Sequence, residues 1–233
     1  YVEDIPSNQI ENWAKIQADR FSNAVIRGFH TELETVYEEK NMSLTKDFQK
    51  ALATIDGILF PDHPYGTQTV LGTQEHLKNP SIINIKNYYK KYYVPNNMAI
   101  CVSGDFNPDE MVAIIEKYFG RMQPNEDLSE LTLKTEFQLE APVEKEVYGL
   151  DAEAIIMGWK YPGAASKDAL IAEVAASVLY NGAAGLIDLN INQEQKVLGA
   201  SGMSYPRPDA SELIIMAYPK QGQTLDEVRE IML

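Results

Sequence analysis

Two glutamates in one short segment are the residues of this chain best suited to chemistry. Glu32 and Glu39 stand seven residues apart in the segment 28–42, which reads G-F-H-T-E-L-E-T-V-Y-E-E-K-N-M. In an α-helix this spacing places both side chains two turns apart on nearly one line. Two carboxylates that point the same way into a cleft can share a cation or a proton. The alternative is that they are surface charges like Glu34 and Glu38, because runs of charged residues usually face solvent.

The same segment carries the apolar pattern of an amphipathic helix. Its apolar side chains recur at positions i, i+4, i+7 and i+8, namely Phe29, Leu33, Val36 and Tyr37. At about 100° per residue, Glu34 and Glu38 fall well away from this stripe, whereas Glu32 and Glu39 fall on its shoulder. The sequence therefore predicts a helix with Glu32 and Glu39 at the edge of its buried face.

The three histidines do not form a recognised metal-binding motif. His30 and Glu34 are four residues apart and could hold a metal, although a surface pair on a helix is the more common arrangement. His63 and His76 lie in the polar stretch 61–80, where packing or exposure to solvent is the default. The motifs H-E-x-x-H, H-x-x-E-H and G-x-S-x-G are absent from the sequence, as are phosphate-loop and dinucleotide motifs.

Composition argues against several classes of partner. The 233 residues carry a formal net charge of −14, whereas binding of nucleic acid needs a basic face. Tyrosines around Lys90 and Lys91 could form a stacking platform, but their helical spacing and the acidic charge favour core packing. We therefore expect no nucleic acid partner, and no membrane span because long apolar runs are missing. Cys101 is the single cysteine and is expected to be a small buried thiol.

Helical and strand patterns alternate along the rest of the chain, which predicts a mixed α/β layer structure. Helix N-caps are expected at Ser81, Asn107, Ser166 and Thr224, and at either Ser43 or Thr45. Strands are expected at 98–103, 143–147 and 154–161, and a hairpin at 197–205 and 212–218. The stretch 61–80 is expected to be a loop with one turn of helix. The helix after Ser166 is expected to turn four apolar residues inward, Leu170, Ile171, Val174 and Val178.

Both ends of the sequence have the character of cut ends. Tyr1 is not an initiator methionine, and the helix opened by Thr224 reaches Leu233 after barely two turns. We therefore expect the chain to be a piece of a longer protein, in which case the lack of a signal segment carries no information.

Several motifs follow one another in a fixed order. After the glutamate segment come F-P-D-H-P-Y-G-T, V-L-G-T-Q-E-H-L, Y-Y-K-K-Y-Y-V-P-N-N-M-A-I-C-V-S-G-D-F-N-P-D-E and K-Y-F-G. In this order and spacing they resemble the M16 metallopeptidases, the family of pitrilysin, insulin-degrading enzyme and mitochondrial processing peptidase. The resemblance runs from residue 9 to the end of the chain and is strongest over 29–120. After residue 150 it is looser, and 185–188 do not match the family's usual arginine and leucine pattern.

The resemblance implies an α/β (α+β) fold with a mixed, largely antiparallel sheet packed with helices. It implies that residues 1–80 are the C-terminal part of the catalytic N-terminal region and that 81–233 are a C-terminal-type region. By motif position, Glu39 resembles the distal zinc (Zn²⁺) ligand of the family. Glu32 resembles its second acidic residue, which supports catalysis beside the metal.

In the family, zinc polarises a water that attacks a peptide carbonyl after deprotonation by a glutamate of an H-x-x-E-H motif. That motif also carries two histidine ligands, and the resemblance places it upstream of Tyr1. We therefore expect part of a zinc-dependent metalloendopeptidase that acts on peptide or protein substrates together with a second M16-type half or subunit. The chain alone is expected to be inactive and without tightly bound zinc. The alternative is a non-catalytic M16-like subunit with a chamber-forming or assembly role.

Overall fold

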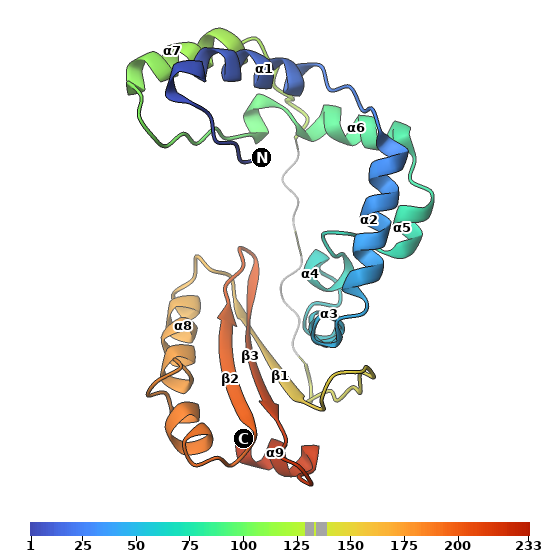
Figure 1. Ribbon diagram of the computed structural model, residues 1–233, viewed down its shortest axis with the longest axis vertical. Helices are drawn as coiled ribbons and strands as arrows, with labels where there is room; N and C mark the ends of the chain where they lie inside the picture. Colours follow the sequence, from blue (N-terminus) through green and yellow to red (C-terminus); the bar gives the residue numbers. More distant parts are fainter. Residues whose placement is uncertain (129–132, 134–138) are drawn as a thin grey trace. The chain divides into compact units, whose positions relative to one another are not determined.

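The computed structural model describes residues 1–128, 133 and 139–233, which belong to two compact units (Figure 1). The first unit takes residues 1–37 and 75–131, and the second takes 38–74 and 132–233. Helix α2 (Phe29–Ser43) contributes residues to both units. Each unit is described by itself below.

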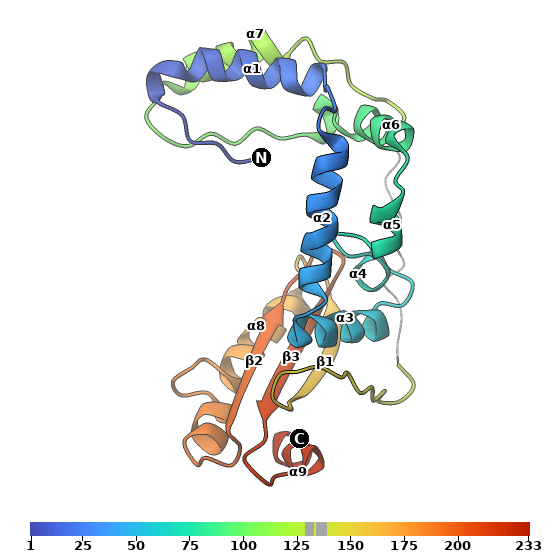
Figure 2. The ribbon, with the colours of Figure 1, turned by 45° about the vertical axis from the view of Figure 1, so that its right-hand side comes forward.

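All regular secondary structure among the described residues of the first unit is helical. Besides the start of α2 it contains short 3₁₀ turns at Ser7–Gln9 and Pro95–Asn97, helices α1 (Ile10–Ser22), α6 (Ile82–Tyr92) and α7 (Pro108–Phe119), and most of α5 (Gln74–Lys78). Helices α1 and α7 lie side by side (Figures 1 and 2). Trp13 packs on Phe119 with ring centroids 6.2 Å apart, and the Tyr118 hydroxyl donates to Glu11 at 2.9 Å. Aromatic packing and charged contacts thus join the two helices.

Two predicted helix caps in this unit are confirmed. The Ser81 hydroxyl accepts the backbone N–H of Asn84 at 3.3 Å. The Asn107 side chain accepts the N–H groups of Asp109 and Glu110 at 2.9 and 3.2 Å. Both satisfy donors that the first turn of a helix leaves without partners.

The strand predicted at 98–103 is wrong. These residues are irregular in the structure, and Cys101 is exposed rather than buried. A strand needs a neighbouring strand to satisfy its backbone groups. The described part of this unit offers no strand to pair with, so the apolar run has no sheet to join.

The second unit is built on an antiparallel sheet of three strands in the order β1-β3-β2. They are β1 (Ile155–Pro162), β2 (Gly199–Tyr205) and β3 (Ala210–Tyr218). Leu213 of the central strand stands opposite Trp159 of β1 and Ser204 of β2. This confirms three predicted strands and the hairpin, and with them the mixed α/β class with a largely antiparallel sheet.

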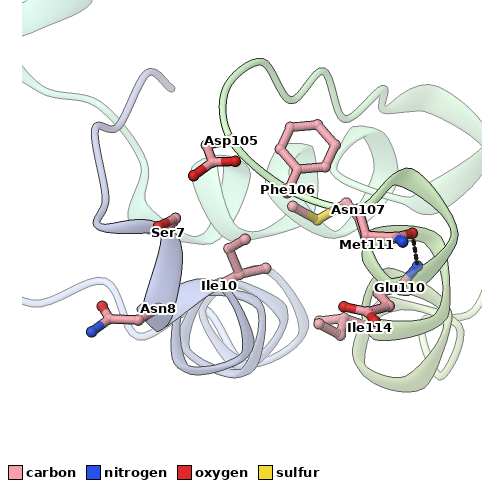
Figure 3. A pocket seen from close by; sticks show the side chains of 9 residues that line it. All are labelled: Ser7, Asn8, Ile10, Asp105, Phe106, Asn107, Glu110, Met111 and Ile114. Carbon is pink, nitrogen blue, oxygen red and sulfur yellow. Dashed lines mark hydrogen bonds between the residues drawn. The ribbon is translucent and has the colours of Figure 1, made fainter.

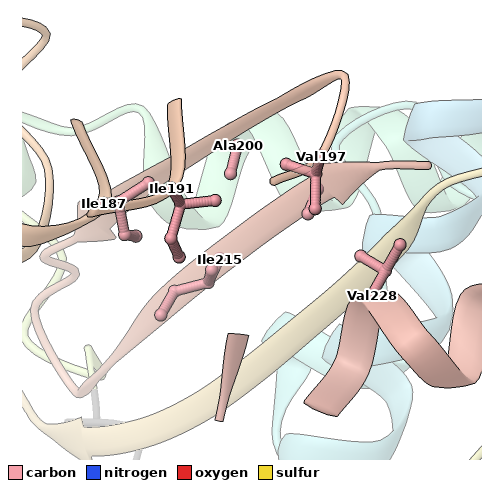
Figure 4. Close-up of a cluster of buried hydrophobic side chains, with 7 residues drawn as sticks. Ile187, Ile191, Val197, Ala200, Ile215 and Val228 are labelled. Carbon is pink, nitrogen blue, oxygen red and sulfur yellow. The ribbon is translucent and has the colours of Figure 1, made fainter. Parts of the chain in front are cut away.

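Helices cover both faces of this sheet. Helix α3 (Asp47–Leu59) lies against one face, where Ile55 and Leu59 approach Gly158 and Ile214. The neighbouring residue Ile215 points to the opposite face, since successive strand residues alternate. There it meets helix α8 (Lys167–Leu179), a π-helical turn (Asp188–Asn192) and helix α9 (Leu225–Met232). The buried cluster on that face contains Ile187, Ile191, Val197, Ala200, Ile215, Ala217 and Val228 (Figure 4).

The rotation of α8 differs from the prediction, although its N-cap is confirmed. The Ser166 hydroxyl accepts the N–H of Ala169 at 3.0 Å. The four apolar side chains expected inward, Leu170, Ile171, Val174 and Val178, are instead 54–62% exposed. Ala169 and Ala176 are buried in their place. The helix is apolar around much of its circumference, so the sequence defines no single stripe and the small alanines allow the closest approach to the sheet.

Two further expectations for this unit are wrong. Residues 143–147 form no strand and are exposed. Neither Ser43 nor Thr45 caps α3. Ser43 is the last residue of α2, and the N-cap residue of α3 is Lys46, whose side chain makes no capping hydrogen bond. Asp47 instead accepts the backbone N–H of Asp151 at 2.8 Å, which ties the start of α3 to a distant loop.

The remaining predictions concern loops and the last helix. The stretch 61–80 holds two short helices, α4 (Pro64–Thr67) and α5, rather than one turn. The capping box at Thr224 is confirmed, with the Glu227 carboxylate accepting the Thr224 N–H at 2.8 Å. Across the described ranges, no helix has both the length and the apolar character needed to cross a membrane.

Candidate functional site

Helix α2 forms as predicted and carries both candidate glutamates. It begins directly after Gly28, whose φ of +66° suits glycine. Near its other end, the Gln74 side chain donates to Asn41 at 2.7 Å, and Lys40 donates to Thr69 at 3.3 Å. The polar stretch after α3 thus helps to position the end of the helix that carries Glu39.

Glu32 and Glu39 are both exposed. Their spacing in a continuous helix places them two turns apart on nearly one line. The apolar stripe beside them is half-buried, and α2 has no fully buried residue. Glu34 and Glu38 are exposed as well, so exposure alone does not separate the candidate pair from the other two glutamates.

The described residues do not bring together a set of zinc ligands. No group of three or more His, Cys, Asp or Glu side chains among them could hold a metal ion. Glu39 by itself supplies one carboxylate, whereas zinc sites in proteins use three or four protein ligands. Zinc therefore does not fit the described part of this chain as a complete site.

His30 and His63 take the less reactive of their possible roles. His30 is exposed and contacts the ring of Phe29 at 5.4 Å between centroids. His63 is only 2% exposed. Its Nδ1 accepts the N–H of Tyr65 at 3.1 Å and so caps α4, while Nε2 lies 3.6 Å from Oδ2 of Asp209. Packing, rather than metal binding, accounts for its position.

Sequence patterns did not single out one charged cluster in the second unit. Arg207 makes ion pairs with Asp56 and Glu212, which come from separate elements. Side chains that meet only through the fold leave no periodic signal in the sequence. The burial of three polar side chains in this region, His63, Ser211 and Glu212, becomes evident only in the structure.

A small cavity of about 250 Å³ lies in the first unit, between the start of α1 and the start of α7 (Figure 3). Its wall is partly apolar, with Ile10, Met111 and Ile114, and partly acidic, with Asp105 and Glu110. It includes no residue of α2 and no histidine or cysteine. It is therefore separate from the candidate glutamates.

Comparison with known proteins decides the family. The model of the Peptidase M16 inactive domain matches residues 83–233, which is more than half of the chain. The chain belongs to the M16 peptidase family. The resemblance inferred from the ordered motifs is thereby confirmed.

Relatives of this M16 chain carry protease names. It is 26% identical over 121 residues to a probable mitochondrial-processing peptidase subunit beta of Schizosaccharomyces pombe, covering 51% of this chain and 26% of that protein. It is 27% identical over 128 residues to zinc protease PqqE of Helicobacter pylori, covering 52% of this chain and 28% of that protein. The M16 chain thus spans less than two thirds of either relative.

A solved structure shares the fold of this M16 chain. The crystal structure of a protease from Helicobacter pylori aligns with a TM-score of 0.80. The alignment covers 98% of this chain and 57% of the Helicobacter pylori chain. The sequence identity is 18%, so this likeness concerns the fold alone.

Proposed function

We propose that the protein to which this chain belongs is a zinc-dependent M16 endopeptidase that hydrolyses peptide bonds. Membership of the family and the protease names of its relatives support this proposal. At the level of residues the proposal rests on the pair Glu32 and Glu39, which stand two turns apart on nearly one line of α2 and resemble the family's acidic residues by motif position. Glu39 would supply one zinc ligand, and Glu32 would be a carboxylate beside the metal that supports catalysis.

The other zinc ligands would have to come from residues outside the described part of this chain. A single carboxylate cannot bind zinc tightly. In this proposal, residues 1–80 belong to the catalytic-type region and 81–233 to the second type of M16 region. The match of the inactive-domain model to residues 83–233 supports that division. A second M16-type half or subunit and a peptide or protein substrate are the proposed partners.

The test uses the full-length protein, with zinc content and cleavage of a quenched fluorescent peptide library as separate measurements. We expect Glu39→Gln to lose both zinc and cleavage. Glu32→Gln should keep zinc and lose turnover by roughly 10- to 100-fold, the usual effect of removing a group that supports a metal site. Glu38→Gln is the matched control, because Glu38 is exposed on the same helix beside Glu39. Wild-type zinc content and activity in Glu39→Gln would exclude the assigned role.

A second candidate function is a non-catalytic M16 subunit that shapes a chamber or assembles a complex. The description of the matched model as an inactive domain is compatible with it, but that match begins at residue 83 and includes neither Glu32 nor Glu39. In that case the full-length protein would bind no zinc and cleave no peptide, yet would co-purify with another M16-type subunit. The zinc measurement on the unmodified protein therefore separates the two candidates.

A further inference from the structure

The loop between β2 and β3 places an arginine among aromatic rings and carboxylates of the second unit. The Nη2 atom of Arg207 lies 2.8 Å from Oδ1 of Asp56 on α3 and 2.8 Å from Oε1 of Glu212 on β3. Its guanidinium carbon lies 4.8 Å from the ring centroid of Phe60 and 4.4 Å from that of Tyr65. The rings cover part of the guanidinium group, and the lower local dielectric strengthens the electrostatic interactions within the cluster.

Arg207, Asp56 and Glu212 together carry one net negative charge when all three are ionised. One guanidinium faces two carboxylates that share a single nitrogen, and Glu212 is only 6% exposed. Oε2 of Glu212 and Nε of Arg207 are buried, and neither has a hydrogen-bond partner among the described residues. A buried excess of negative charge is costly, so the cluster favours uptake of one proton.

Every element packed around Glu212 contributes a charged or titratable group. On the sheet, Lys160 of β1 and Tyr205 of β2 stand opposite Glu212 in register. Asp56 comes from α3, and Arg207 from the β2–β3 loop. On the α4 side lie three more groups, His63, Tyr65 and Asp209, with the Tyr65 hydroxyl 3.2 Å and the His63 Nε2 3.6 Å from Oδ2 of Asp209.

We propose that the β2–β3 loop, residues 206–209, is a pH-responsive latch whose attachment to α3 and α4 depends on a proton carried by Glu212. A protonated Glu212 removes one of the two negative charges beside Arg207 and can donate a hydrogen bond to Asp56. Loss of that proton to solvent leaves two carboxylates in repulsion at one guanidinium nitrogen. The attachment of the loop then weakens.

The energetics of Glu212 agree with this geometry. Burial, reinforced by the nearby charge of Asp56, raises the pKa of Glu212 to about 7, although Arg207 acts in the opposite direction. The proton would therefore be exchanged near neutral pH. Backbone bonds such as Ala164 N–H to the Arg207 carbonyl, at 2.8 Å, anchor the loop on its other side. Loss of the proton should thus first affect the contacts with α3 and α4.

Amide hydrogen exchange followed by NMR tests the latch on the chain as it stands. The amides of Gly66 and Thr67 donate to the His63 carbonyl at 3.0 and 3.1 Å and report on α4. After correction for intrinsic exchange, their protection should fall by about tenfold between pH 6 and pH 8.5, which follows from linkage to one proton. Glu212→Gln should remove this dependence, because a neutral amide keeps the charge balance. Glu173→Gln, at an exposed position of α8, should keep it.

Two results would overturn the latch: protection that does not change with pH in the unmodified chain, or an identical fall in Glu212→Gln. Should Glu212→Gln fail to fold, the ¹³Cδ chemical shift of Glu212 in the unmodified chain decides the matter. A titration midpoint above about 5.5 supports the latch. A midpoint below that value, near the ordinary range of glutamate, excludes it.

Discussion

Arg207 and Asp56 are 151 positions apart in the sequence, yet the Arg207 Nη2 donates to the Asp56 Oδ1 at 2.8 Å. The contact joins the β2–β3 loop to α3 within the second unit. Glu212 binds the same nitrogen, so the three side chains act as one group. Removing one member of such a group leaves the opposite charges without a partner, which usually costs more than the interaction itself contributes.

Arg207→Ala should lower the free energy of unfolding by roughly 2–3 kcal/mol, because Asp56 and Glu212 lose their shared cation. This figure lies below the cost of breaking a fully buried pair, since 24% of the Arg207 side chain is exposed. Urea unfolding at neutral pH measures it. Arg121→Ala, at an exposed position, is the control and should cost less than about 0.5 kcal/mol. Equal losses in both variants would contradict a stabilising role for the cluster.

Glu212 should make the stability of the chain fall as pH rises toward neutrality. Its pKa is raised from 4.5 to about 7, so the folded state binds the proton more tightly than the unfolded state does. The stability due to this proton is fully present below pH 4.5 and is lost as pH rises through 7. Between about pH 5 and pH 8 we expect a loss on the order of 2–3 kcal/mol in urea unfolding. Glu212→Gln should lack this component, and an increase in wild-type stability over that range would refute it.

The outer face of α8 should tolerate polar substitution. Val174→Ser replaces an exposed side chain and should change the free energy of unfolding by less than about 0.5 kcal/mol. Ala176→Leu, on the same helix but buried, should cost roughly 1–3 kcal/mol by overpacking. Thermal unfolding of the two variants compares them directly. A larger loss for Val174→Ser than for Ala176→Leu would mean that the helix is rotated.

The cap of α7 should contribute measurably to stability. Asn107→Ala removes the acceptor for the N–H groups of Asp109 and Glu110 and should cost about 1 kcal/mol. Asn107→Asp keeps an acceptor oxygen and should retain most of the stability. Denaturant titrations of both variants measure the difference. A similar loss in both would attribute the effect to something other than capping.

In the chain as it stands, Glu39→Gln should change the free energy of unfolding by no more than about 0.5 kcal/mol, because the side chain is exposed. Glu32→Gln, at an equally exposed position, should behave in the same way. Urea unfolding checks both. A loss of several kcal/mol, the scale of a broken buried charge network, would show that Glu39 has a structural role.

Local signals in the sequence were sufficient for much of this molecule. The helix caps at Ser81, Asn107, Ser166 and Thr224 were predictable because each depends on residues no more than three positions away. Strands β1 and β3 of the second unit were predictable from largely apolar runs bounded by turns. The helix that carries Glu32 and Glu39 was likewise predictable from its spacing, and the family from the order of its motifs.

Tertiary structure determines the features that depend on contacts between segments far apart in the sequence. The apolar run 98–103 lacks a strand because the described part of its unit offers none to pair with. Helix α8 buries Ala169 and Ala176 because packing on the sheet, rather than its nearly uniform apolar sequence, sets its rotation. The proton-binding cluster of Asp56, Arg207 and Glu212 exists only because the fold brings α3 to the β2–β3 loop. Capping and periodicity act within a few residues, whereas pairing, packing and charge burial act between segments that only the folded chain brings together.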